Sequence, residues 1–401
     1  MKQQADHNYE LPTANCKLPL RSNGIIAKGL EGIVANSTSL SAVRGEEGVL
    51  IYQGYNINEL AGKVSFEEVI YLLWNGKLPT AAELLQLHEE LASQRELPQG
   101  VIDFILKAPH DANPMDVIRT AISMLGLYDK EGARDSLNKT PAFNRLRALS
   151  ITAKVSVIAA YYHRARQGKE LPPINKNLTE AEHFLYLLEG KIPTKEAAET
   201  LDICYVLHAD HGMNASTFSA RVTISTLTDI YSAITSAIGT LKGPLHGGAN
   251  EGVIHMLQEI GEESNVDTWI EKALANKKKI MGIGHRVYKT LDPRAPHLRE
   301  MAKGMCERLG QNKWMNMAER IATLMKEKKG LNANVDFYSA IVYYSLGLPT
   351  DMFTPIFSIS RVAGWTAHIL EQLADNRIYR PLSEYIGPAE GKIVEPISQR
   401  V

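Results

Sequence analysis

The chain has 401 residues, which exceeds the usual size of one domain, so two cooperating domains are expected. Hydrophobic residues make up 44% and charged residues 22%, as is typical of a soluble globular protein, and the net charge of −1 gives no reason to expect nucleic acid or a membrane as a partner. The three cysteines, Cys16, Cys204 and Cys306, are widely spaced and odd in number. This spacing argues against a disulfide framework or a cysteine-based zinc site and favours a reducing, cytoplasmic compartment.

The N-terminal residues are polar and lack a basic start followed by an apolar core, so no signal peptide is expected. Residues 1–28 are interpreted as a mobile N-terminal segment. The most apolar stretch, residues 222–239, contains polar residues such as Asp229. It is therefore predicted to be a buried or interface helix and not a membrane span.

Helix-start signals are frequent along the chain. Ser/Thr-x-x-Glu patterns begin at Ser65, Thr80 and Thr179, and each predicts a capping box. Thr354 followed by Pro355 predicts another start, with Thr as N-cap and Pro at the first helical position. These starts open segments with apolar residues at helical spacing, which indicates a mainly α protein.

Only one β-hairpin is predicted, formed by residues 40–52 around a turn at 45–48. Residues 71–80 and 186–194 echo each other, and both read as a helix, a glycine stop, a proline-marked turn and a new helix. The echo occurs twice only, which argues against a repeat protein. The polar residues 167–177 are predicted to be a connector.

Histidines cluster in three segments of the middle third. These are residues 208–214 (HADHGMN), 243–250 (GPLHGGAN) and 282–286 (GIGHR). Two of the three place the histidine among glycines, where the backbone can approach a ligand closely. A functional role is therefore favoured over a purely structural one.

These segments also allow two other interpretations, a metal site and a dinucleotide loop. His208 and His211 have a spacing that can place two metal ligands on one helix face, with Asp210 nearby, but no HExxH motif or cysteine pair supports zinc. A dinucleotide loop at residues 282–284 is disfavoured because Val287 occupies the third glycine position of GxGxxG.

Basic residues are concentrated between residues 272 and 299, where eight Lys/Arg accompany one acid, Asp292. Residues 277–279 fit a solvated helix face. Near His285 and Lys289, a site for a multiply anionic ligand such as the phosphates of CoA is favoured.

Two charged residues stand out near the C-terminus. Asp336 precedes a predicted helix that runs through Leu346, and its simplest role is an N-cap. Arg361 lies in the apolar run of residues 356–365, without a partner nearby in sequence. An anionic ligand would supply that partner.

Together these segments resemble the citrate synthase family, from about residue 29 to residue 387. Five motifs occur in the family's order and carry the resemblance: residues 208–216 (HADHGMNAS), 243–249 (GPLHGGA), 282–294 (GIGHRVYKTLDPR), 334–339 (NVDFYS) and 360–365 (SRVAGW). The chain departs from the family at residues 332–333, where many relatives have Tyr-Pro, and at Ala340, where glycine is common.

The resemblance implies a mainly α, two-domain helical fold with a small N-terminal β-hairpin. Residues 29–245 and 347–401 would form a large domain, and residues 246–346 a small domain that closes over a cleft. The implied enzyme condenses acetyl-CoA with oxaloacetate and water to give citrate and CoA, the first step of the tricarboxylic acid cycle. It would need no metal or cofactor and would act as a homodimer with shared active sites.

The resemblance also implies roles for single residues. Asp336 would remove a proton from the acetyl methyl group, His246 would hydrogen-bond the thioester oxygen, and His285 would donate to the ketone oxygen. The oxaloacetate ligands would be His211, Arg294, Arg361 and Arg380, with Arg380 supplied by a second subunit. The CoA ligands would be Gly282, Ile283, Gly284 and Lys289.

Three alternatives stay open at this point. A 2-methylcitrate synthase would use propionyl-CoA with the same residues, because one extra methylene changes selectivity by only about 1–3 kcal/mol. A histidine-based metal hydrolase would contain zinc and lose activity with a chelator. A silent binding protein would bind CoA without forming product, and the intact set of His246, His285 and Asp336 argues against it.

Overall fold

The structure is a computed structural model that describes residues 26–129 and 140–400. It divides into two units, Met1–Thr38 and Ser39–Val401. The described part of the first unit contains a single 3-10 turn, η1 (Lys28–Leu30). Most of the predicted N-terminal segment, residues 1–28, and Cys16 within it lie outside the described residues.

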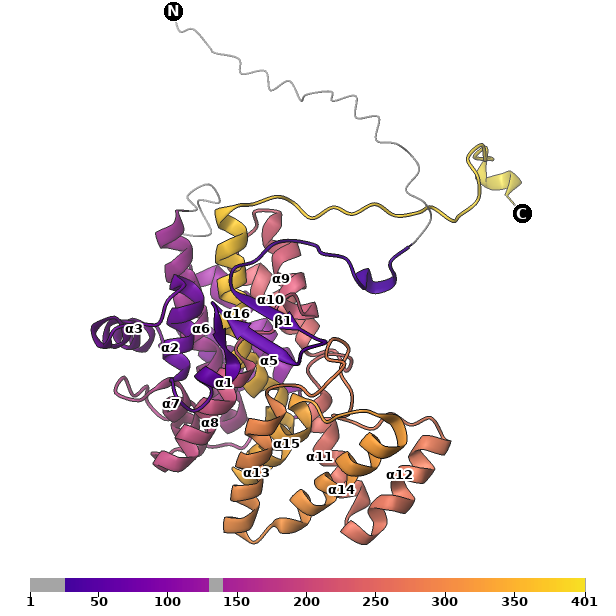
Figure 1. Ribbon diagram of the computed structural model, residues 1–401. Coiled ribbons are helices and arrows are strands. Elements are labelled where there is room, and N and C mark those ends of the chain that lie inside the picture. Colours follow the sequence, from indigo (N-terminus) through magenta and orange to yellow (C-terminus); the bar gives the residue numbers. More distant parts are fainter. Residues whose placement is uncertain (1–25, 130–139, 401) are drawn as a thin grey trace, which may run out of the picture. The chain divides into compact units, whose positions relative to one another are not determined.

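The second unit is built almost entirely of helices (Figure 1), so the predicted mainly α fold is confirmed. Its strands are β1 (Ser41–Arg44), β2 (Val49–Tyr52) and β3 (Tyr55–Asn56). Its α-helices are α1 (Ile57–Leu60), α2 (Phe66–Asn75), α3 (Ala81–Ser93), α4 (Gln99–Lys107), α5 (Pro114–Tyr128), α6 (Pro141–Ala165), α7 (Glu180–Glu189), α8 (Lys195–His208), α9 (Ala215–Ser225), α10 (Ile230–Leu241), α11 (Ala249–Ile260), α12 (Val266–Ala275), α13 (Ala295–Leu309), α14 (Asn312–Lys329), α15 (Val335–Ser345) and α16 (Phe353–Ala374).

The predicted helix starts are mostly confirmed. Capping boxes form at Ser65, Thr80 and Thr179, where each side-chain oxygen accepts from the backbone N–H three residues on. The prediction for Thr354 is wrong, because a 3-10 turn, η3 (Thr350–Met352), leads directly into α16, which begins at Phe353, two residues before the predicted start at Pro355. The Thr354 hydroxyl donates instead to the carbonyl oxygen of Gly247 at 3.2 Å.

Local turn chemistry explains the other boundaries. Both predicted glycine stops are confirmed, since Gly76 and Gly190 end α2 and α7 with left-handed φ values of 75° and 78°. The single helix predicted over residues 222–239 is wrong. The chain breaks after Ser225, and the Asp229 side chain caps the new helix α10 by accepting from the N–H of Ser232 at 2.8 Å.

The predicted hairpin is confirmed, and it belongs to a three-stranded antiparallel sheet in the order β1-β2-β3. Ser41 pairs with Tyr52 and Arg44 pairs with Val49 across the first two strands. The third strand was missed because two residues are too short for a period-2 pattern to show. Predicted connector 167–177 lies between α6 and α7 and contains no helix or strand.

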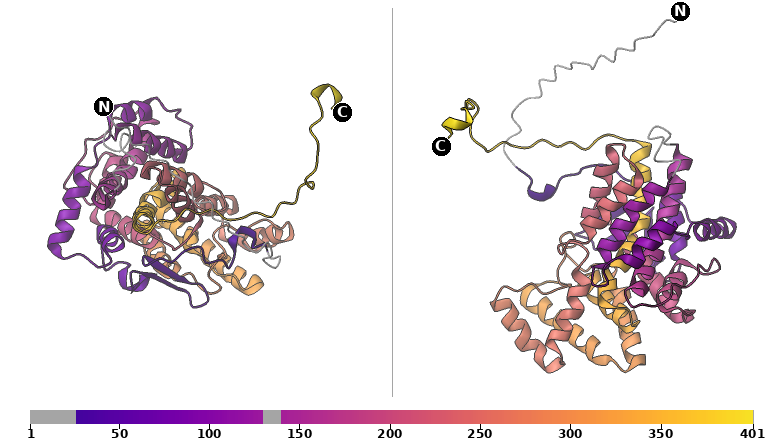
Figure 2. Two further views of the ribbon diagram at one scale, coloured as in Figure 1. Left: turned by 90° about the horizontal axis from the view of Figure 1, so that it is seen from above. Right: turned by 180° about the vertical axis from the view of Figure 1, so that it is seen from behind.

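The core is organised around α16, which is buried along most of its length and contacts α2, α6, α8 and α9. Helices α11 to α15 pack largely against one another, and α11 also contacts α16 (Figure 1). After α16, Asn376 and Tyr379 still bond Ser225 at the end of α9, and the chain beyond them runs away from the helices (Figure 2). The domain partition at residues 246 and 346 stays a prediction. Among the described helices, none is long and apolar enough to cross a membrane.

Candidate active site

His246 lies between α10 and α11 and is held by Ser216 at the start of α9. The backbone N–H of Ser216 donates to His246 Nε2 at 3.2 Å, and the Ser216 hydroxyl lies 2.8 Å from the same nitrogen. Burial and the positive charge of Arg361 lower the pKa of His246 to about 4. The ring is therefore neutral at pH 7, and because Nε2 accepts, the proton lies on Nδ1.

His285 is held by its own loop, residues 285–291, which we name the His285 loop. Its Nδ1 accepts from the backbone N–H groups of Val287 and Tyr288 at 3.0 and 3.1 Å. Burial and the charge of Arg294 lower the pKa of His285 to about 4. This ring is also neutral, with its proton on Nε2. His246 and His285 thus present opposite ring nitrogens as donors.

His211 follows α8 in residues 209–212, which we name the His211 loop. Its ring centroid lies 5.4 Å from that of His285, and its Nε2 lies 3.1 Å from the hydroxyl of Tyr288. Burial and the charge of Arg294 hold the pKa of His211 well below its ordinary value. The structure therefore brings His211 and His285 together from segments about 70 residues apart.

The metal interpretation of His208 and His211 is not supported. Helix α8 ends at His208, so the two rings do not share one helix face. His208 directs Nδ1 to the carbonyl oxygen of Cys204 at 2.8 Å, a bond within its own helix. No group of His, Cys, Asp and Glu that could hold a metal ion occurs in residues 26–129 or 140–400.

Arg294 is 2% exposed and forms a two-point ion pair with Asp292, with distances of 2.9 and 2.8 Å. Burial alone would raise the pKa of Asp292, but the charge and hydrogen bonds of Arg294 outweigh it and hold this pKa below its usual value. Asp292 also accepts from the backbone N–H of Val335 at 3.2 Å. Arg294 is thereby fixed against the first turn of α15, which carries Asp336.

Arg361 is 1% exposed, and among the described residues it forms no ion pair with a carboxylate. Its Nε donates to the carbonyl oxygen of His208 at 2.7 Å, and its guanidinium carbon lies 4.7 Å from the centroid of the Phe357 ring. Burial lowers its pKa to about 10. The charge of the buried Asp210 acts in the opposite direction. A buried cation without a direct ion pair is still costly, and an anionic ligand would offset that cost.

Asp336 lies in the first turn of α15 and is not the N-cap. The N-cap is Asn334, whose side-chain oxygen accepts from the N–H of Asp336 at 3.0 Å. Asp336 is 9% exposed, and its Oδ1 is buried without a hydrogen-bond partner in the part of the chain that the structure describes. Burial raises its pKa to about 7, while Arg294 and Arg361 act in the opposite direction. The carboxyl is therefore a much stronger base than an exposed aspartate.

The glycine pair Gly282 and Gly284 lies directly against this turn. The backbone N–H of Asn334 donates to Gly282 O at 2.9 Å, and its side chain donates to Gly284 O at 2.8 Å. Gly282 has a φ of 72°, and a Cβ there would meet Cα of Phe337 at 2.9 Å. Ile283 forms a β-bridge with Ala333 between them. These contacts place the backbone of the predicted CoA-binding residues next to Asp336.

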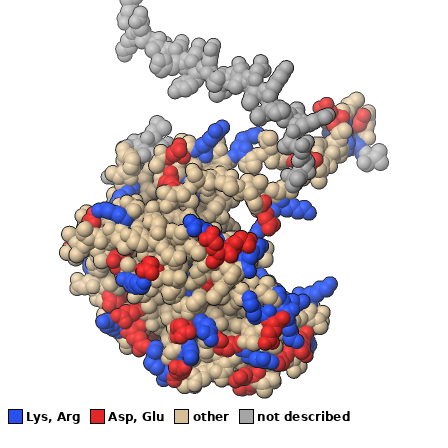
Figure 3. Space-filling view, in the orientation of Figure 1, with Lys and Arg blue, Asp and Glu red and all other residues tan. Residues whose placement is uncertain are grey.

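The basic residues differ in their surroundings. Lys289 is exposed, as are residues 277–279, which follow the end of α12 and so do not form the helix face predicted for them. Lys278 pairs with Glu259 at 2.9 Å. Figure 3 shows basic and acidic side chains interspersed over the visible face.

Arg380 is exposed on the segment after α16, and no hydrogen bond or ion pair joins it to the other described site residues.

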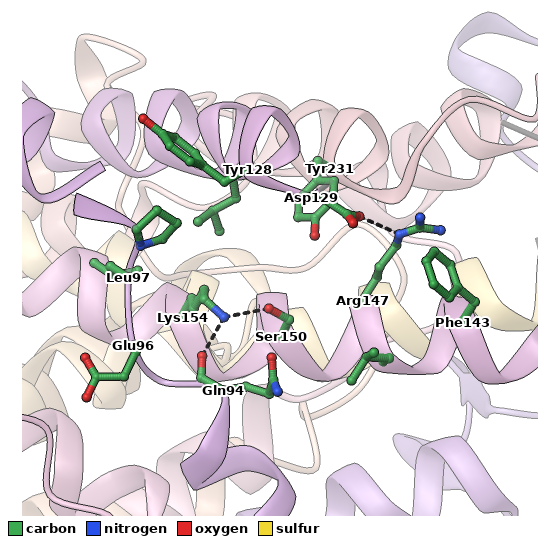
Figure 4. Close-up of a pocket in the computed structure, with 13 residues that line it drawn as sticks. Gln94, Glu96, Leu97, Tyr128, Asp129, Phe143, Arg147, Ser150, Lys154 and Tyr231 are labelled. Atoms are coloured by element: carbon green, nitrogen blue, oxygen red, sulfur yellow. Dashed lines mark hydrogen bonds and ion pairs between the residues drawn. The ribbon is translucent and has the colours of Figure 1, made fainter. Parts of the chain in front are cut away.

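A cavity of about 340 Å³ lies elsewhere, among α5, α6, α10 and the segment between α3 and α4 (Figure 4). Lys154, Arg147 and Tyr231 line it together with apolar side chains, and none of the predicted site residues does. The Lys154 ammonium donates to the carbonyl oxygen of Gln94 and the hydroxyl of Ser150. The chemistry of the histidine cluster is therefore separate from this cavity.

Several residues that complete the site were not assigned a role from the sequence. Ser216, Tyr288 and Asp292 lie inside the recognised motifs, so their position was available but their contacts were not. Ser41 and Tyr52 lie in the hairpin and carry no sequence signal of function. The assembled site offers two neutral imidazole donors, two buried guanidinium groups and one basic carboxyl, a set suited to anionic substrates and proton abstraction.

Comparisons with known proteins agree with this geometry. A family model described as "Citrate synthase, C-terminal domain" matches residues 29–382. Citrate synthase 2 of Bacillus subtilis is 49% identical over 374 residues, which are 93% of this chain and 99% of that relative. 2-Methylcitrate synthase 1 of Corynebacterium glutamicum is 42% identical over 94% of this chain and 100% of its own length. The solved ternary complex of carboxymethyl coenzyme A and oxaloacetate with citrate synthase from Thermoplasma acidophilum matches with a TM-score of 0.87 at 34% identity, and covers 94% of this chain and 100% of that one.

Proposed function

This chain belongs to the citrate synthase family, and from this premise we propose that it condenses acetyl-CoA with oxaloacetate and water to give citrate and CoA. The reaction is the first step of the tricarboxylic acid cycle. Acetyl-CoA is a substrate, and we propose that no resident cofactor or metal takes part. The observation that carries the proposal is the buried Asp336 carboxyl, whose pKa is raised to about 7 and on which the charges of the buried Arg294 and Arg361 act.

Asp336 is proposed as the base that removes a proton from the acetyl methyl group. A carboxylate in water is a weak base for a carbon-bound proton, with a pKa of about 3.9. Burial supports the role because it raises the pKa of Asp336 to about 7, and Oδ1 has no competing partner among the described residues. The step still requires stabilisation of the enolate oxygen that forms as the proton leaves.

His246 is proposed to supply that stabilisation through Nδ1–H. Its Nε2 is occupied by the N–H of Ser216, which leaves Nδ1 as the donor. Donors of this kind typically contribute about 10²–10³ in rate. The enolate carbon then attacks the ketone carbon of oxaloacetate, and His285 donates its Nε2 proton to the ketone oxygen. Water hydrolyses the resulting thioester and releases CoA.

Arg294, Arg361 and His211 are proposed to bind oxaloacetate. Two guanidinium groups suit a dicarboxylate, because each planar fork can bind a carboxylate at two points. Arg294 already gives two of its donors to Asp292, so its remaining donors are the ones available to a ligand. Gly282, Ile283, Gly284 and Lys289 are proposed to contact CoA.

We also propose that the protein is a cytoplasmic homodimer in which Arg380 reaches the partner's site. The support is that Arg380 is exposed on an extended C-terminal segment and has no role within its own chain among the described contacts. We further propose that residues 246–346 form a domain that closes over the remainder of the protein.

A thiol-release assay with oxaloacetate and either acetyl-CoA or propionyl-CoA, with and without chelator, tests the function. We expect oxaloacetate-dependent CoA release, faster with acetyl-CoA and unchanged by chelator. Faster turnover of propionyl-CoA would instead identify a 2-methylcitrate synthase, as some relatives at 42% identity are. Loss of activity with chelator would support a metal hydrolase, and no release of CoA would reject the proposal.

A further inference from the structure

Ser41, at the start of β1, holds the two residues that flank His211. Its hydroxyl donates to Oδ2 of Asp210 at 2.5 Å and accepts from the backbone N–H of Gly212 at 3.0 Å. Ser41 and Asp210 are 9% and 0% exposed, so water does not replace these bonds. One hydroxyl on the hairpin therefore fixes the His211 loop on both sides of the histidine.

Tyr52 on β2 adds two further bonds to the same loop. Its hydroxyl donates to the carbonyl oxygen of Asp210 at 2.8 Å and accepts from the Asp210 N–H at 3.1 Å. From the opposite side, His368 on α16 lies 3.2 Å from Oδ2 of Asp210. Asp210 is thus clamped between the hairpin and α16, although neither Ser41 nor Tyr52 has a proposed contact with substrate.

The tip of the same hairpin lies against the His285 loop. The backbone N–H of Lys289 donates to Gly45 O at 3.1 Å. A Cβ on Gly45 would meet Val287 O at 2.2 Å, and a Cβ on Gly48 would meet Leu291 O at 2.9 Å. Only glycine permits this approach. Because the N–H of Val287 also holds Nδ1 of His285, the hairpin tip supports the orientation of that ring.

We propose that the hairpin Ser41–Tyr52 is a positioning element for both substrate-facing loops, with Ser41 and Tyr52 as positioning residues for His211 and Gly45 for His285. The inference rests on the proposed function, since it assigns these residues to oxaloacetate binding and condensation. The two loops already meet at the Tyr288 hydroxyl, 3.1 Å from His211 Nε2. Because the hairpin contacts both loops, it fixes the separation of the His211 and His285 rings.

The physical reason is preorganisation. A binding side chain is held in place by the residues behind it, and a displacement of about 1 Å can cost roughly 10²-fold in rate. Removing the Ser41 hydroxyl leaves the N–H of Gly212 without its acceptor and takes one partner from the Asp210 carboxylate. The His211 loop then samples other conformations, and oxaloacetate must select the competent one, which weakens its binding.

The test compares Ser41→Ala with Ser41→Thr and with Ser156→Ala. Ser156 is a matched control, because its hydroxyl is also fully buried but bonds Ala153 O within α6. Calorimetry should show oxaloacetate binding weakened roughly tenfold or more in Ser41→Ala and largely restored in Ser41→Thr, which keeps the hydroxyl. Ser156→Ala should bind oxaloacetate as the wild type does. KM for acetyl-CoA at saturating oxaloacetate should change little in all three.

Wild-type oxaloacetate affinity in folded Ser41→Ala overturns the assignment of Ser41. If Ser41→Ala does not fold, Tyr52→Phe tests the same clamp by removing only the hydroxyl, and unchanged oxaloacetate affinity there overturns it equally. An inactive wild type rejects the proposed function, while the calorimetric comparison still decides whether the hairpin supports an oxaloacetate site.

Gly45→Ala tests the tip. It should lower kcat more than it weakens oxaloacetate binding, because it displaces Val287 and so His285. Gly304→Ala is the control, since a Cβ there meets only the flexible end of Arg308 at 3.3 Å. Equal kcat in Gly45→Ala and Gly304→Ala overturns the role of the tip.

Discussion

The backbone N–H of Ser216 donates to Nε2 of His246 over 3.2 Å, and this bond decides which ring nitrogen of His246 remains available as a donor. A backbone N–H has no alternative role as acceptor, so the neutral ring must carry its proton on Nδ1. The hydroxyl of Ser216 is fixed as well, because it accepts from Trp365 Nε1 at 3.0 Å.

Substitutions of His246 should rank by the atom they retain. His246→Ala should lower kcat about 10²–10³-fold through loss of one donor to the enolate oxygen. His246→Asn should retain more activity than His246→Gln, because the amide nitrogen of Asn lies nearer the position of Nδ1. Steady-state kcat values for the three variants check this order. A more active Gln variant would indicate that Nε2 is the donor and that the Ser216 contact breaks during turnover.

Asp336→Ala should abolish condensation and leave oxaloacetate binding largely intact, because the base acts on the acyl partner. Loss of a catalytic acid or base typically costs about 10²–10⁴ in rate. The measurement is CoA release together with calorimetry of oxaloacetate binding on the same preparation. Near-normal turnover in a folded variant would show that Asp336 is only a structural residue of α15 and would reject the mechanism in which it is the base.

The pH dependence should report Asp336. Burial raises its pKa to about 7, and the carboxylate form is the base, so kcat/KM for acetyl-CoA should fall about tenfold per unit as pH drops below about 7. Bound oxaloacetate adds negative charge and moves the inflection upward. His246 and His285, with pKa values lowered to about 4, stay neutral over pH 6–8 and do not contribute. A rate that stays flat from pH 8 down to pH 5 would contradict this assignment.

A mixing experiment should reveal whether Arg380 serves the partner's site. Asp336→Ala and Arg380→Ala homodimers should each be nearly inactive. In a mixed dimer with sharing, one site receives both defects and the other receives none. Random co-assembly makes half of the dimers mixed, so about a quarter of wild-type activity should return.

The control for this experiment is each variant alone, taken through the same dissociation and reassembly. Without sharing, every site keeps one defect and nothing returns. Absence of recovery in verified mixed dimers therefore rejects the shared site.

Glu67→Gln should stabilise the protein at alkaline pH. Glu67 is 2% exposed, and its Oε1 accepts from the N–H of Glu180 at 2.8 Å, while Oε2 is buried without a partner among the described residues. Burial, followed by the charge of Glu180, raises its pKa to about 7; Arg95 acts in the opposite direction. Asp202, which also lies nearby, has its pKa raised mainly by burial.

The sign follows from the direction of the shift. A carboxyl whose folded-state pKa is raised stabilises the fold fully below its unfolded-state pKa and loses that contribution as pH rises through about 7. Melting temperatures of Glu67→Gln should therefore exceed those of the wild type at pH 8, and the difference should shrink at pH 5. The charge of Glu67 also contributes to the raised pKa of Asp202. Its removal in Glu67→Gln therefore favours ionised Asp202 and acts in the same direction at pH 8. A difference that is the same at both values would show that the pKa of Glu67 is not raised in the folded protein.

The sequence by itself determined the features that depend on local chemistry. The capping boxes at Ser65, Thr80 and Thr179, the stops at Gly76 and Gly190 and the hairpin turn are set by residues within a few positions of one another, so their signals survive in one dimension. The family motifs also predicted His211, His285, Arg294 and Asp336 as one set before any contact was known. The failures at Thr354 and in residues 222–239 came from competing turns that packing and an Asp cap selected.

Only the tertiary structure decided the chemical state of the site. The raised pKa of Asp336, the neutral rings of His246 and His285 and the lowered pKa of Arg361 all result mainly from burial, and burial is produced by elements distant in sequence. Ser41 and Asp210 are separated by 169 positions, yet they meet at 2.5 Å behind His211. No local pattern encodes such a bond, because it forms only when a hairpin and a helix end are packed together and water is excluded between them.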